Sequence, residues 1–596
     1  MNMKKIAAPL LGLALLVPAV SSVHAQSHRP AYDKEIEFIG MDAPKTAAEQ
    51  NTMYSKALVK VKDENGEEKT VPLSYNLLFK PGDVINGKTT GTTVNSEGRV
   101  IMDTVTDPDH PKPYVSTAPD SNTLLSVNGK SGKLYLVNHF ESIPSNIGRL
   151  PNAIYLNTVK QDKKTGKLAV TDIKPIDFSQ DGGIWTPCAG ILSPWNTHLG
   201  AEEYEPDARA HEKSPETSAV TQFARHYYND DKRIGNPYLY GHLPEISVSS
   251  NGKATAAKHY SMGRLSFERT TVMPDNRTVY IGDDGTYTMM FMYIADRAKD
   301  LSAGTLYAAK WHQTGSAEGG ASNLNWIRLG HATDKEVKKM AQSLTFSDIF
   351  ETTEDKAYAE ARGFAAVKTS SSGGKTEYLK VKPGMKKAAA FLESRRYGAI
   401  LGATSEFNKM EAVEYNKKDN KVYMAMSYIE KGMGASASDP ADDIHVDKIS
   451  AGGVYEIGLS GGQRDAEGKK MESDFIATSM NGLITGEDLD SADSAGNTAD
   501  VDKIANPDNI VYSDKMRTLF IAEDSSMHSN NFAWAYNIDT KKLSRLVSVP
   551  DGGEATGLQF QENLNGHTYL MVSSQNPGSV GYLQLPNLYN KNKKNR

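Results

Sequence analysis

Cysteine is almost absent from this chain, since Cys188 is the only one in 596 residues. One thiol cannot form a disulfide within the chain, so the fold must hold together without covalent cross-links. A solitary cysteine is most often an inert residue of a hydrophobic core. A functional role for Cys188 therefore has to be argued from the residues around it.

Long apolar runs and excess basic charge are also lacking. The one apolar run, residues 6–20, is shorter than the roughly 20 residues that a membrane-spanning helix needs. The formal net charge of −6 gives no positive field for nucleic acid or for an anionic membrane. We therefore expect no membrane span and no nucleic-acid partner.

Residues 1–25 have the pattern of an export signal. Lys4 and Lys5 precede the apolar run, and Val23-His24-Ala25 forms a small-residue cleavage site before Gln26. Because the segment has no twin-arginine pair, we expect export by the general route, in an unfolded state. The mature chain, residues 26–596, is expected to be periplasmic or secreted.

Short runs of β-forming residues separated by polar turns make up most of the chain. Five runs share a template in which a polar turn precedes a strand centred on an aromatic residue. The intervals between these aromatics are close to three, three, two and one times about 48 residues, a period typical of propeller blades. The aromatics are Tyr135, Tyr280, Tyr423, Phe520 and Tyr569. We predict an all-β fold, a β-propeller of six blades.

Acidic residues follow several of these strands: Glu141 after the first, Asp283-Asp284 after the second and Glu523-Asp524 after the fourth. Any one of them could be a turn former. Recurring at the same place in several blades, they would converge on one end of the central channel. A ring of carboxylates there repels itself unless cations neutralise it. The pattern therefore predicts a metal site.

Between the strands, three stretches are interpreted as insertions in a single domain: residues 205–235, 334–400 and 433–503. The first is polar and charged, and most of the second has helix-like spacing. The third is rich in Gly, Ser, Ala and Asp, and we expect a long exposed excursion with little core.

The segment around the cysteine combines features that are ordinary singly. Cys188-Ala-Gly190 is followed by Pro194-Trp195 and then by Glu202-Glu203. This order resembles the signature of the PhoX family of secreted bacterial alkaline phosphatases. Further similar segments follow in the family's order, from about residue 115 to 580. They include Asn138-His139-Phe-Glu141, Asn236-Pro-Tyr238-Leu-Tyr240-Gly241, Met262-Gly263-Arg264-Leu-Ser-Phe-Glu268, Asn506-Pro507-Asp508-Asn509, Glu554-Ala-Thr556-Gly557 and Gln575-Asn576-Pro577-Gly578.

The resemblance implies a β-propeller whose channel mouth holds Fe3+ and Ca2+ and hydrolyses small phosphate monoesters, or diesters, as a monomer. Cys188 would bind iron, with Glu268 as a co-ligand. Carboxylates and an amide would bind iron or calcium, namely Glu202, Glu203, Glu411, Asp508 and Asn509. The strand-end pattern adds Asp283, Glu523 and Glu554 as candidates. Thiolate suits iron, whereas carboxylate and amide oxygens suit calcium.

One departure from the family concerns phosphate binding. Lys409 stands where the family has arginine, two positions before Glu411. Lysine attracts phosphate as a point charge but lacks the bidentate fork of arginine. We expect Lys409 to contact the substrate.

Two other functions are compatible with the residues. A calcium-dependent propeller hydrolase of the lactonase type would use the Asp, Asn and Glu residues and would not need Cys188. A non-catalytic binding propeller would use its metals for structure alone.

Overall fold

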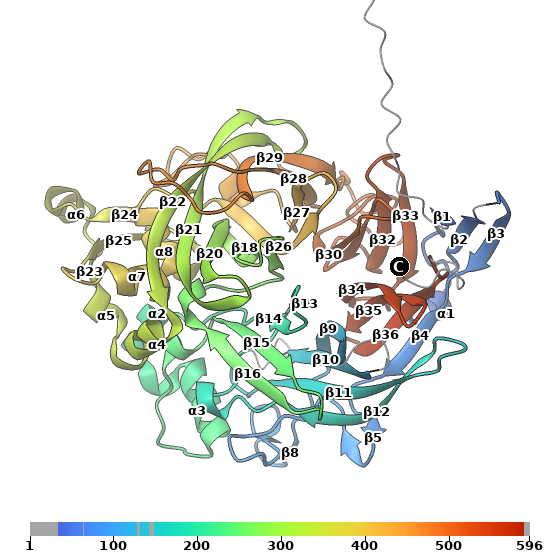
Figure 1. Cartoon of the computed structure of the whole chain (residues 1–596). Coiled ribbons are helices and arrows are strands. Elements are labelled where there is room, and N and C mark those ends of the chain that lie inside the picture. The colour runs from blue at the N-terminus through green and yellow to red at the C-terminus, as the bar shows by residue number, and fades with distance from the viewer. Residues whose placement is uncertain (1–33, 64, 128–131, 142–147, 589–596) are drawn as a thin grey trace, which may run out of the picture.

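The computed structural model describes residues 34–63, 65–127, 132–141 and 148–588. The predicted export signal, residues 1–25, lies outside these ranges. Strands account for 45% and helices for 14% of the structure, so the all-β prediction is confirmed. Figure 1 shows the main sheets arranged around a common centre, in a propeller-like fold.

Four of the main sheets have four strands each. In order of hydrogen bonding they are β12 (Leu168–Pro175), β11 (Ala153–Gln161), β10 (Lys133–Glu141) and β9 (Ala118–Val127); β13 (Gly190–Leu192), β14 (His198–Gly200), β15 (Leu243–Val248) and β16 (Ala254–His259); β30 (Pro507–Ser513), β31 (Thr518–Glu523), β32 (Phe532–Asn537) and β33 (Leu543–Ser548); and β34 (Glu554–Leu564), β35 (His567–Gln575), β36 (Ser579–Leu585) and β4 (Tyr75–Phe79). In the last sheet, the early strand β4 completes a sheet made from the end of the chain (Figure 1).

The fifth main sheet has ten strands. Their order is β17 (Thr271–Val272), β18 (Thr278–Ile281), β20 (Phe291–Arg297), β21 (Asp300–Gly315), β22 (Ala321–Thr333), β29 (Ile476–Thr485), β28 (Gly453–Ser460), β27 (Lys421–Met426), β26 (Phe407–Asn416) and β19 (Asp283–Thr288). Because β22 pairs with β29, two meanders that would otherwise be separate blades share one sheet. The six-blade count therefore stays a prediction.

Smaller elements decorate the main sheets. Two three-stranded sheets contain β1 (Lys34–Ile39), β2 (Leu58–Asp63) and β3 (Glu68–Pro72), and β23 (Phe350–Thr353), β25 (Thr376–Val381) and β24 (Ala365–Lys368). Two short hairpins are β5 (Val84–Ile85) with β6 (Lys88–Thr89) and β7 (Met102–Asp103) with β8 (Lys112–Pro113). The helices are α1 (Ala47–Gln50), α2 (Ala208–Lys213), α3 (Ala219–Tyr228), α4 (Asp334–Ser343), α5 (Phe346–Ile349), α6 (Lys356–Arg362), α7 (Lys386–Leu392) and α8 (Ser394–Ile400). Among the described residues, no helix is both long and apolar enough to cross a membrane.

The five template aromatics occupy equivalent places. They lie in β10, β18, β27, β31 and β35, each of which is the second strand of its meander. Side chains alternate between the two faces of a strand. In the first sheet, Leu136 packs on one side with Met571 of the last sheet, and Tyr135 packs on the other with Ile246 of the next. Both faces of this strand are buried against neighbouring sheets, which is why its central residues, Leu134 to Val137, are apolar.

The expectation for residues 433–503 is wrong in its central part. Residues 453–485 contain β28 and β29, two strands of the ten-stranded sheet. Tyr455, Ile457 and Met480 are fully or almost fully buried in its core. The many Gly, Ser and Asp residues belong to the turns around these strands, and they conceal short apolar runs from a compositional analysis.

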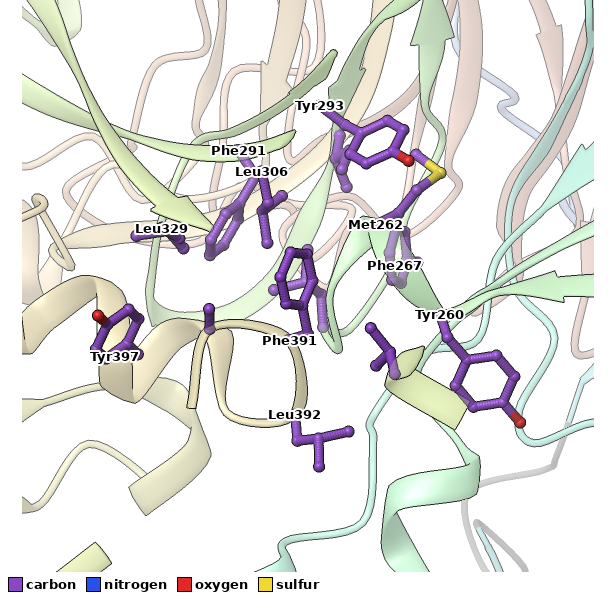
Figure 2. Close-up of a cluster of buried hydrophobic side chains, with 14 of the residues drawn as sticks. Tyr260, Met262, Phe267, Phe291, Tyr293, Leu306, Leu329, Phe391, Leu392 and Tyr397 are labelled. Atoms are coloured by element: carbon purple, nitrogen blue, oxygen red, sulfur yellow. The ribbon is translucent and has the colours of Figure 1, made fainter. Parts of the chain in front are cut away.

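In the described part of the chain, every α-helix except α1 lies in residues 205–235 or 334–400. Helix α4 begins with a capping box, in which Thr333 Oγ1 accepts from Glu336 N at 3.2 Å while Glu336 accepts from Thr333 N at 2.9 Å. Helices α7 and α8 place Phe391 and Tyr397 in a core with Phe291 of the large sheet (Figure 2). The insertions thus pack firmly on the outside of the propeller.

A buried histidine links the second sheet to α4, and we predict that it makes stability depend on pH. His259 pairs with Glu245 at 2.8 Å and Asp334 at 2.9 Å. Burial lowers its pKa, but the two carboxylates outweigh this effect and raise the pKa from 6.5 to about 9. The stabilisation by the charged His259 is fully present below pH 6.5 and is lost as pH rises through about 9. This loss lowers the unfolding free energy by about 3 kcal/mol.

The measurement is the difference in unfolding free energy between the wild type and His259→Gln. We expect this difference to be large at pH 6 and to shrink by pH 10. A difference that stays constant across this range would contradict a charged His259.

Candidate metal and phosphate site

A cavity of about 560 Å³ lies where the inner ends of the main sheets meet. Its lining is dominated by acidic side chains and includes the only thiol of the chain. Lys409 is the only lysine or arginine among the described residues that line it. The acidic lining residues are Asp120, Glu141, Glu203, Glu268, Glu411, Asp508, Asp524, Asp551 and Glu554, and they are joined by Cys188, Tyr204, His528 and Gln575.

The strand order explains this convergence. In an antiparallel meander, the start of the first strand lies beside the end of the second, at the same end of the sheet. Asp120, Glu411, Asp508 and Glu554 lie in first strands, and Cys188 and Glu268 come just before β13 and β17. Glu141 and Gln575 end second strands, whereas Glu203, Asp284 and Asp524 follow them. The prediction that strand-end carboxylates meet at one end of a central channel is in accord with this geometry.

Three overlapping groups of these residues bring their ligand atoms within 4.8 Å of one another. They are Asp120, Glu141 and Cys188; Cys188, Glu203 and Glu268; and Glu268, Asp284 and Glu411. Cys188 belongs to two of them, and its Sγ lies 3.6 Å from Asp120 Oδ2. The sequence prediction that Cys188 faces Glu268 and other carboxylates agrees with this arrangement.

The carboxylates destabilise one another in the absence of a cation. Burial and then the charge of Glu411 raise the pKa of Glu268 well above its usual value. Burial and neighbouring acids raise the pKa of Glu141 and of Asp508 to about 8. Glu411 Oε2 is buried and has no hydrogen-bond partner among the described residues. Unpaired buried oxygens beside a thiol form a donor set that suits metal ions.

Lys409 supplies the positive charge of the cavity. Its Nζ lies 3.3 Å from Glu411, 3.6 Å from Asp524 and 3.9 Å from Asp284. Burial lowers its pKa, but these acids raise it well above the usual value. Its φ of 54° is unusual for a residue other than glycine, and such strained backbone is often found at functional sites. Lys409 therefore stays charged and is held at the cavity.

Two histidines support the cysteine segment from behind. His139 Nδ1 lies 2.5 Å from the carbonyl oxygen of Cys188, and His139 Nε2 lies 2.7 Å from His198 Nε2. The remaining nitrogen of His198 contacts Thr123 Oγ1 at 2.8 Å. Both rings are fully buried, so they position Cys188 without lining the cavity.

In three pairs of acidic residues that are adjacent in sequence, the two members point to different surroundings. In Glu202-Glu203, Asp283-Asp284 and Glu523-Asp524, the second member belongs to the cavity or its acidic groups. The first member is turned away and is bound by protein donors. The structure therefore does not place Glu202, Asp283 or Glu523 at the cavity, which corrects these three predictions, and their neighbours Glu203, Asp284 and Asp524 lie there or in its acidic groups instead.

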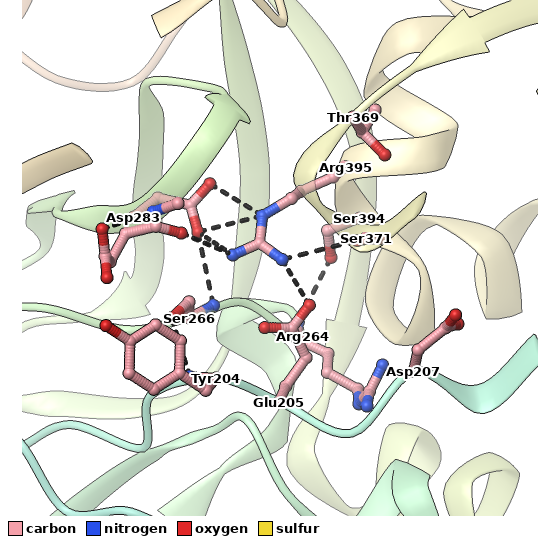
Figure 3. Close-up of polar contacts among 12 residues, drawn as sticks. Tyr204, Glu205, Asp207, Arg264, Ser266, Asp283, Thr369, Ser371, Ser394 and Arg395 are labelled. Carbon is pink, nitrogen blue, oxygen red and sulfur yellow. Dashed lines mark hydrogen bonds and ion pairs between the residues drawn. The ribbon is translucent and has the colours of Figure 1, made fainter. Parts of the chain in front are cut away.

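Each of the three first members has a complete set of partners. Glu202 pairs with Lys258 at 2.7 Å and accepts from the backbone N of Trp185, Gly241 and His242. Asp283 pairs with Arg395, as Figure 3 shows. Glu523 accepts from Trp534 Nε1 at 2.7 Å and from the backbone N of Ala505 and Phe532. Such satisfied carboxylates hold the second member of each pair in place.

The pair Glu202 and Glu203 offers a direct comparison. We expect Glu202→Gln to lower the unfolding free energy by about 3 kcal/mol, because it leaves the buried Lys258 without its counter-charge. We expect Glu203→Gln to lower the amount of bound metal instead. Thermal denaturation of the metal-free proteins and elemental analysis of the loaded ones measure the two effects. Loss of metal in Glu202→Gln with normal metal in Glu203→Gln would contradict the division.

Of the remaining predicted residues, Cys188, Glu203, Glu268, Glu411, Asp508, Glu554 and Lys409 line the cavity. Asn509 is buried beside it, where its amide donates to Asp508. The predicted ligands did not include Asp120, Glu141, Asp284, Asp524 or Gln575. Glu141, Asp284 and Asp524 belonged to the strand-end pattern, but the choice between Asp283 and Asp284, and between Glu523 and Asp524, required the direction of the side chain.

The fold and the cavity define a propeller-like protein with an acidic, thiol-containing centre built to hold cations. The model of the family described as alkaline phosphatase PhoX matches residues 165–578, which is more than half of the chain. The chain therefore belongs to the PhoX family of alkaline phosphatases and is a phosphoric ester hydrolase.

Among solved structures, Pseudomonas fluorescens PhoX in complex with vanadate, a transition state analogue, matches with a TM-score of 0.59. The two chains are 14% identical over 93% of this chain and 98% of that one, a likeness that shows the fold. A putative 6-phosphogluconolactonase from Bacteroides uniformis matches with a TM-score of only 0.28, at 11% identity over 87% of this chain and 97% of that one. This score carries no argument. No curated protein sequence matches the chain significantly.

Proposed function

We propose that this PhoX-family phosphatase hydrolyses small phosphate monoesters, with diesters as a second substrate class, at iron and calcium ions held in the central cavity. The observation that carries the proposal is the convergence of Cys188 with buried carboxylates from separate sheets around a single lysine. Such an arrangement is costly without cations and suits the binding of a phosphate through them.

The donor types suggest how the ions would be held. Cys188 with Glu203 and Glu268, or with Asp120 and Glu141, combines a soft thiolate with carboxylates, a set that suits iron. Asp284, Glu411 and Asp508 provide only oxygens, which suit calcium. When bound, cations at such a site polarise the phosphoryl group and stabilise negative charge on the leaving oxygen.

Lys409 would bind the non-transferred phosphoryl oxygens. Its ammonium group is already held between Glu411, Asp524 and Asp284, so it needs little reorganisation when a substrate arrives. The acidic groups around it keep it protonated at alkaline pH. The chain can therefore keep a positive charge at the phosphate position under the conditions in which an alkaline phosphatase works.

We expect Lys409→Ala to lower kcat/KM for a phosphate ester about tenfold to a hundredfold, because one charge that stabilises the transition state is lost. Lys409→Arg should retain most of the activity. Inhibition by vanadate should weaken in parallel in Lys409→Ala, since a transition-state analogue uses the same contact. Equal activity of Lys409→Ala and the wild type would show that Lys409 only stabilises the acidic cluster.

The function is tested by measuring inorganic phosphate released from a chromogenic ester by protein supplied with iron and calcium, together with elemental analysis. A lactonase would hydrolyse lactones with calcium alone, and a binding propeller would turn over neither substrate. We further propose that the protein acts as a monomer in the periplasm or outside the cell, in keeping with the predicted export signal at residues 1–25.

A further inference from the structure

A second cavity, of about 410 Å³, adjoins the acidic one. Tyr204 lines both, and Asp284 lines the second cavity while its carboxylate belongs to the acidic group with Glu268 and Glu411. The walls come from residues 204–207, which lead into α2, and from the turn at 370–373, which lies between β24 and β25. The two large insertions thus meet beside the place where a phosphoryl group would bind.

The charges of this second cavity are balanced and already paired. Three arginines face three carboxylates in its lining. Arg395 is bound to Asp283 and Glu205, as Figure 3 shows, and Arg396 pairs with Glu377 and Glu393, both at 2.8 Å. These arginines therefore have no charge to spare for a second phosphate.

The third arginine is also committed. Arg264 donates to the backbone carbonyls of Tyr240 at 2.9 Å and of Pro206. Its guanidinium is buried, with only 4% of the residue exposed. A ligand of this cavity is therefore recognised through hydrogen bonds rather than through ionic attraction to these arginines.

Unused hydrogen-bonding atoms remain in the lining. Ser370 Oγ is buried and has no partner among the described residues, although buried polar atoms are nearly always paired. Asp207 uses Oδ1 for both its contacts, with Arg209 N at 3.0 Å and Arg396 at 3.2 Å. Its Oδ2 accepts no hydrogen bond from any described residue. A hydroxyl donor and a carboxylate acceptor, one from each insertion, are thus available in the lining of the cavity.

Tyr204 adds an aromatic surface between the two cavities. Its residue is 42% exposed, and its hydroxyl contacts Asp284. The backbone has a φ of 48° and is held by two hydrogen bonds, from Trp185 Nε1 to Tyr204 O at 2.9 Å and from Tyr204 N to Ser266 Oγ at 2.8 Å. Such strained backbone at a residue other than glycine is typical of functional positions.

We propose that the second cavity binds the leaving group of the substrate and selects polyhydroxylated groups, so that sugar and polyol monophosphates are the substrate class. This inference rests on the proposed phosphatase function. Ser370 and Asp207 would exchange hydrogen bonds with the hydroxyl groups of the ligand, while Tyr204 would support its apolar face. The size of the cavity is within the range of small-molecule sites.

The experiment compares kcat/KM for glucose 6-phosphate with kcat/KM for methyl phosphate, whose leaving group is too small to fill the second cavity. The measured quantity is the ratio of the two values, obtained from phosphate release by the metal-loaded full chain. We expect Ser370→Ala and Asp207→Asn each to lower this ratio about twofold to tenfold, as expected for the loss of one hydrogen bond. Asparagine preserves the cap of α2 at position 207.

Ser372→Ala is the matched control, because Ser372 lies in the same turn but outside the cavity, where its hydroxyl donates to Thr369 O and Lys375 O. Its ratio should equal that of the wild type. An unchanged ratio in both Ser370→Ala and Asp207→Asn would overturn the leaving-group site alone. A wild type that hydrolyses neither ester would instead overturn the proposed function.

Discussion

Replacing Cys188 with serine is expected to remove iron from the protein and to lower kcat/KM for phosphate esters by about a thousandfold or more. The thiol belongs to two of the three groups of ligand atoms, so its loss disrupts both. Substitutions of outer residues at metal sites already reduce metal affinity or activity by about 10- to 100-fold, and a direct ligand should matter more. A serine hydroxyl is a harder and much weaker ligand for iron than a thiolate.

Elemental analysis and steady-state kinetics measure the two effects of Cys188→Ser. A suitable control is Ser193→Ala, which removes a hydroxyl from the turn on the other side of β13 without touching the cavity lining. A Cys188→Ser protein that keeps its calcium, loses its iron and retains full activity would favour an all-calcium hydrolase. Retention of both iron and activity would show that the thiol is only a core residue.

After removal of the metal ions, the stability of the protein is expected to fall steeply as pH rises. Burial and nearby acids raise the pKa of Glu141 from 4.5, and that of Asp508 from 3.8, to about 8. In the metal-free protein, the folded state therefore holds protons that the unfolded chain releases. Stability is highest below about pH 4 and is lost as pH rises through about 8. One such group contributes about 5 kcal/mol, since a pKa unit corresponds to about 1.4 kcal/mol.

Bound cations should abolish this loss, because they neutralise the ionised carboxylates. The measurement is thermal denaturation of the chelated and reloaded proteins at several pH values from 5 to 9. His259 titrates in the same direction in both forms, so its effect cancels in the difference between them. In the chelated protein, Asp508→Asn should flatten the profile. Parallel profiles for the chelated and reloaded proteins would contradict a cavity that holds cations.

The sequence predicted the fold well because its repeated template depends on local pattern. An aromatic in the second strand of a meander, followed in three of the five copies by an acidic residue, can be recognised without knowing the neighbours. The strands β28 and β29 were not predicted, because turn residues outnumber apolar residues in the segments around them. The shared sheet formed by β22 and β29 could not be inferred, since it depends on pairing between segments far apart in the chain.

The site was predicted less completely, and for a different reason. Glu202 and Glu203 have the same chemistry and adjacent positions, but they point in opposite directions and meet different partners. What separates them is Lys258, a residue of β16 whose proximity only the folded chain reveals. Asp120 lay in a strand without any feature that distinguished it from an ordinary buried acid. Charge alone indicates that a cation site exists, but not which of two neighbours builds it.

The pairing of β4 with β36 bears on the order in which the protein matures. The last sheet contributes Glu554 and Gln575 to the cavity. It is complete only when β4, from the beginning of the chain, has paired with β36, from its end. The sheet behind this part of the cavity can thus be completed only after synthesis of the chain is finished. A chain truncated before residue 579 would lack β36, so the ring would remain open at the point where its first and last parts join.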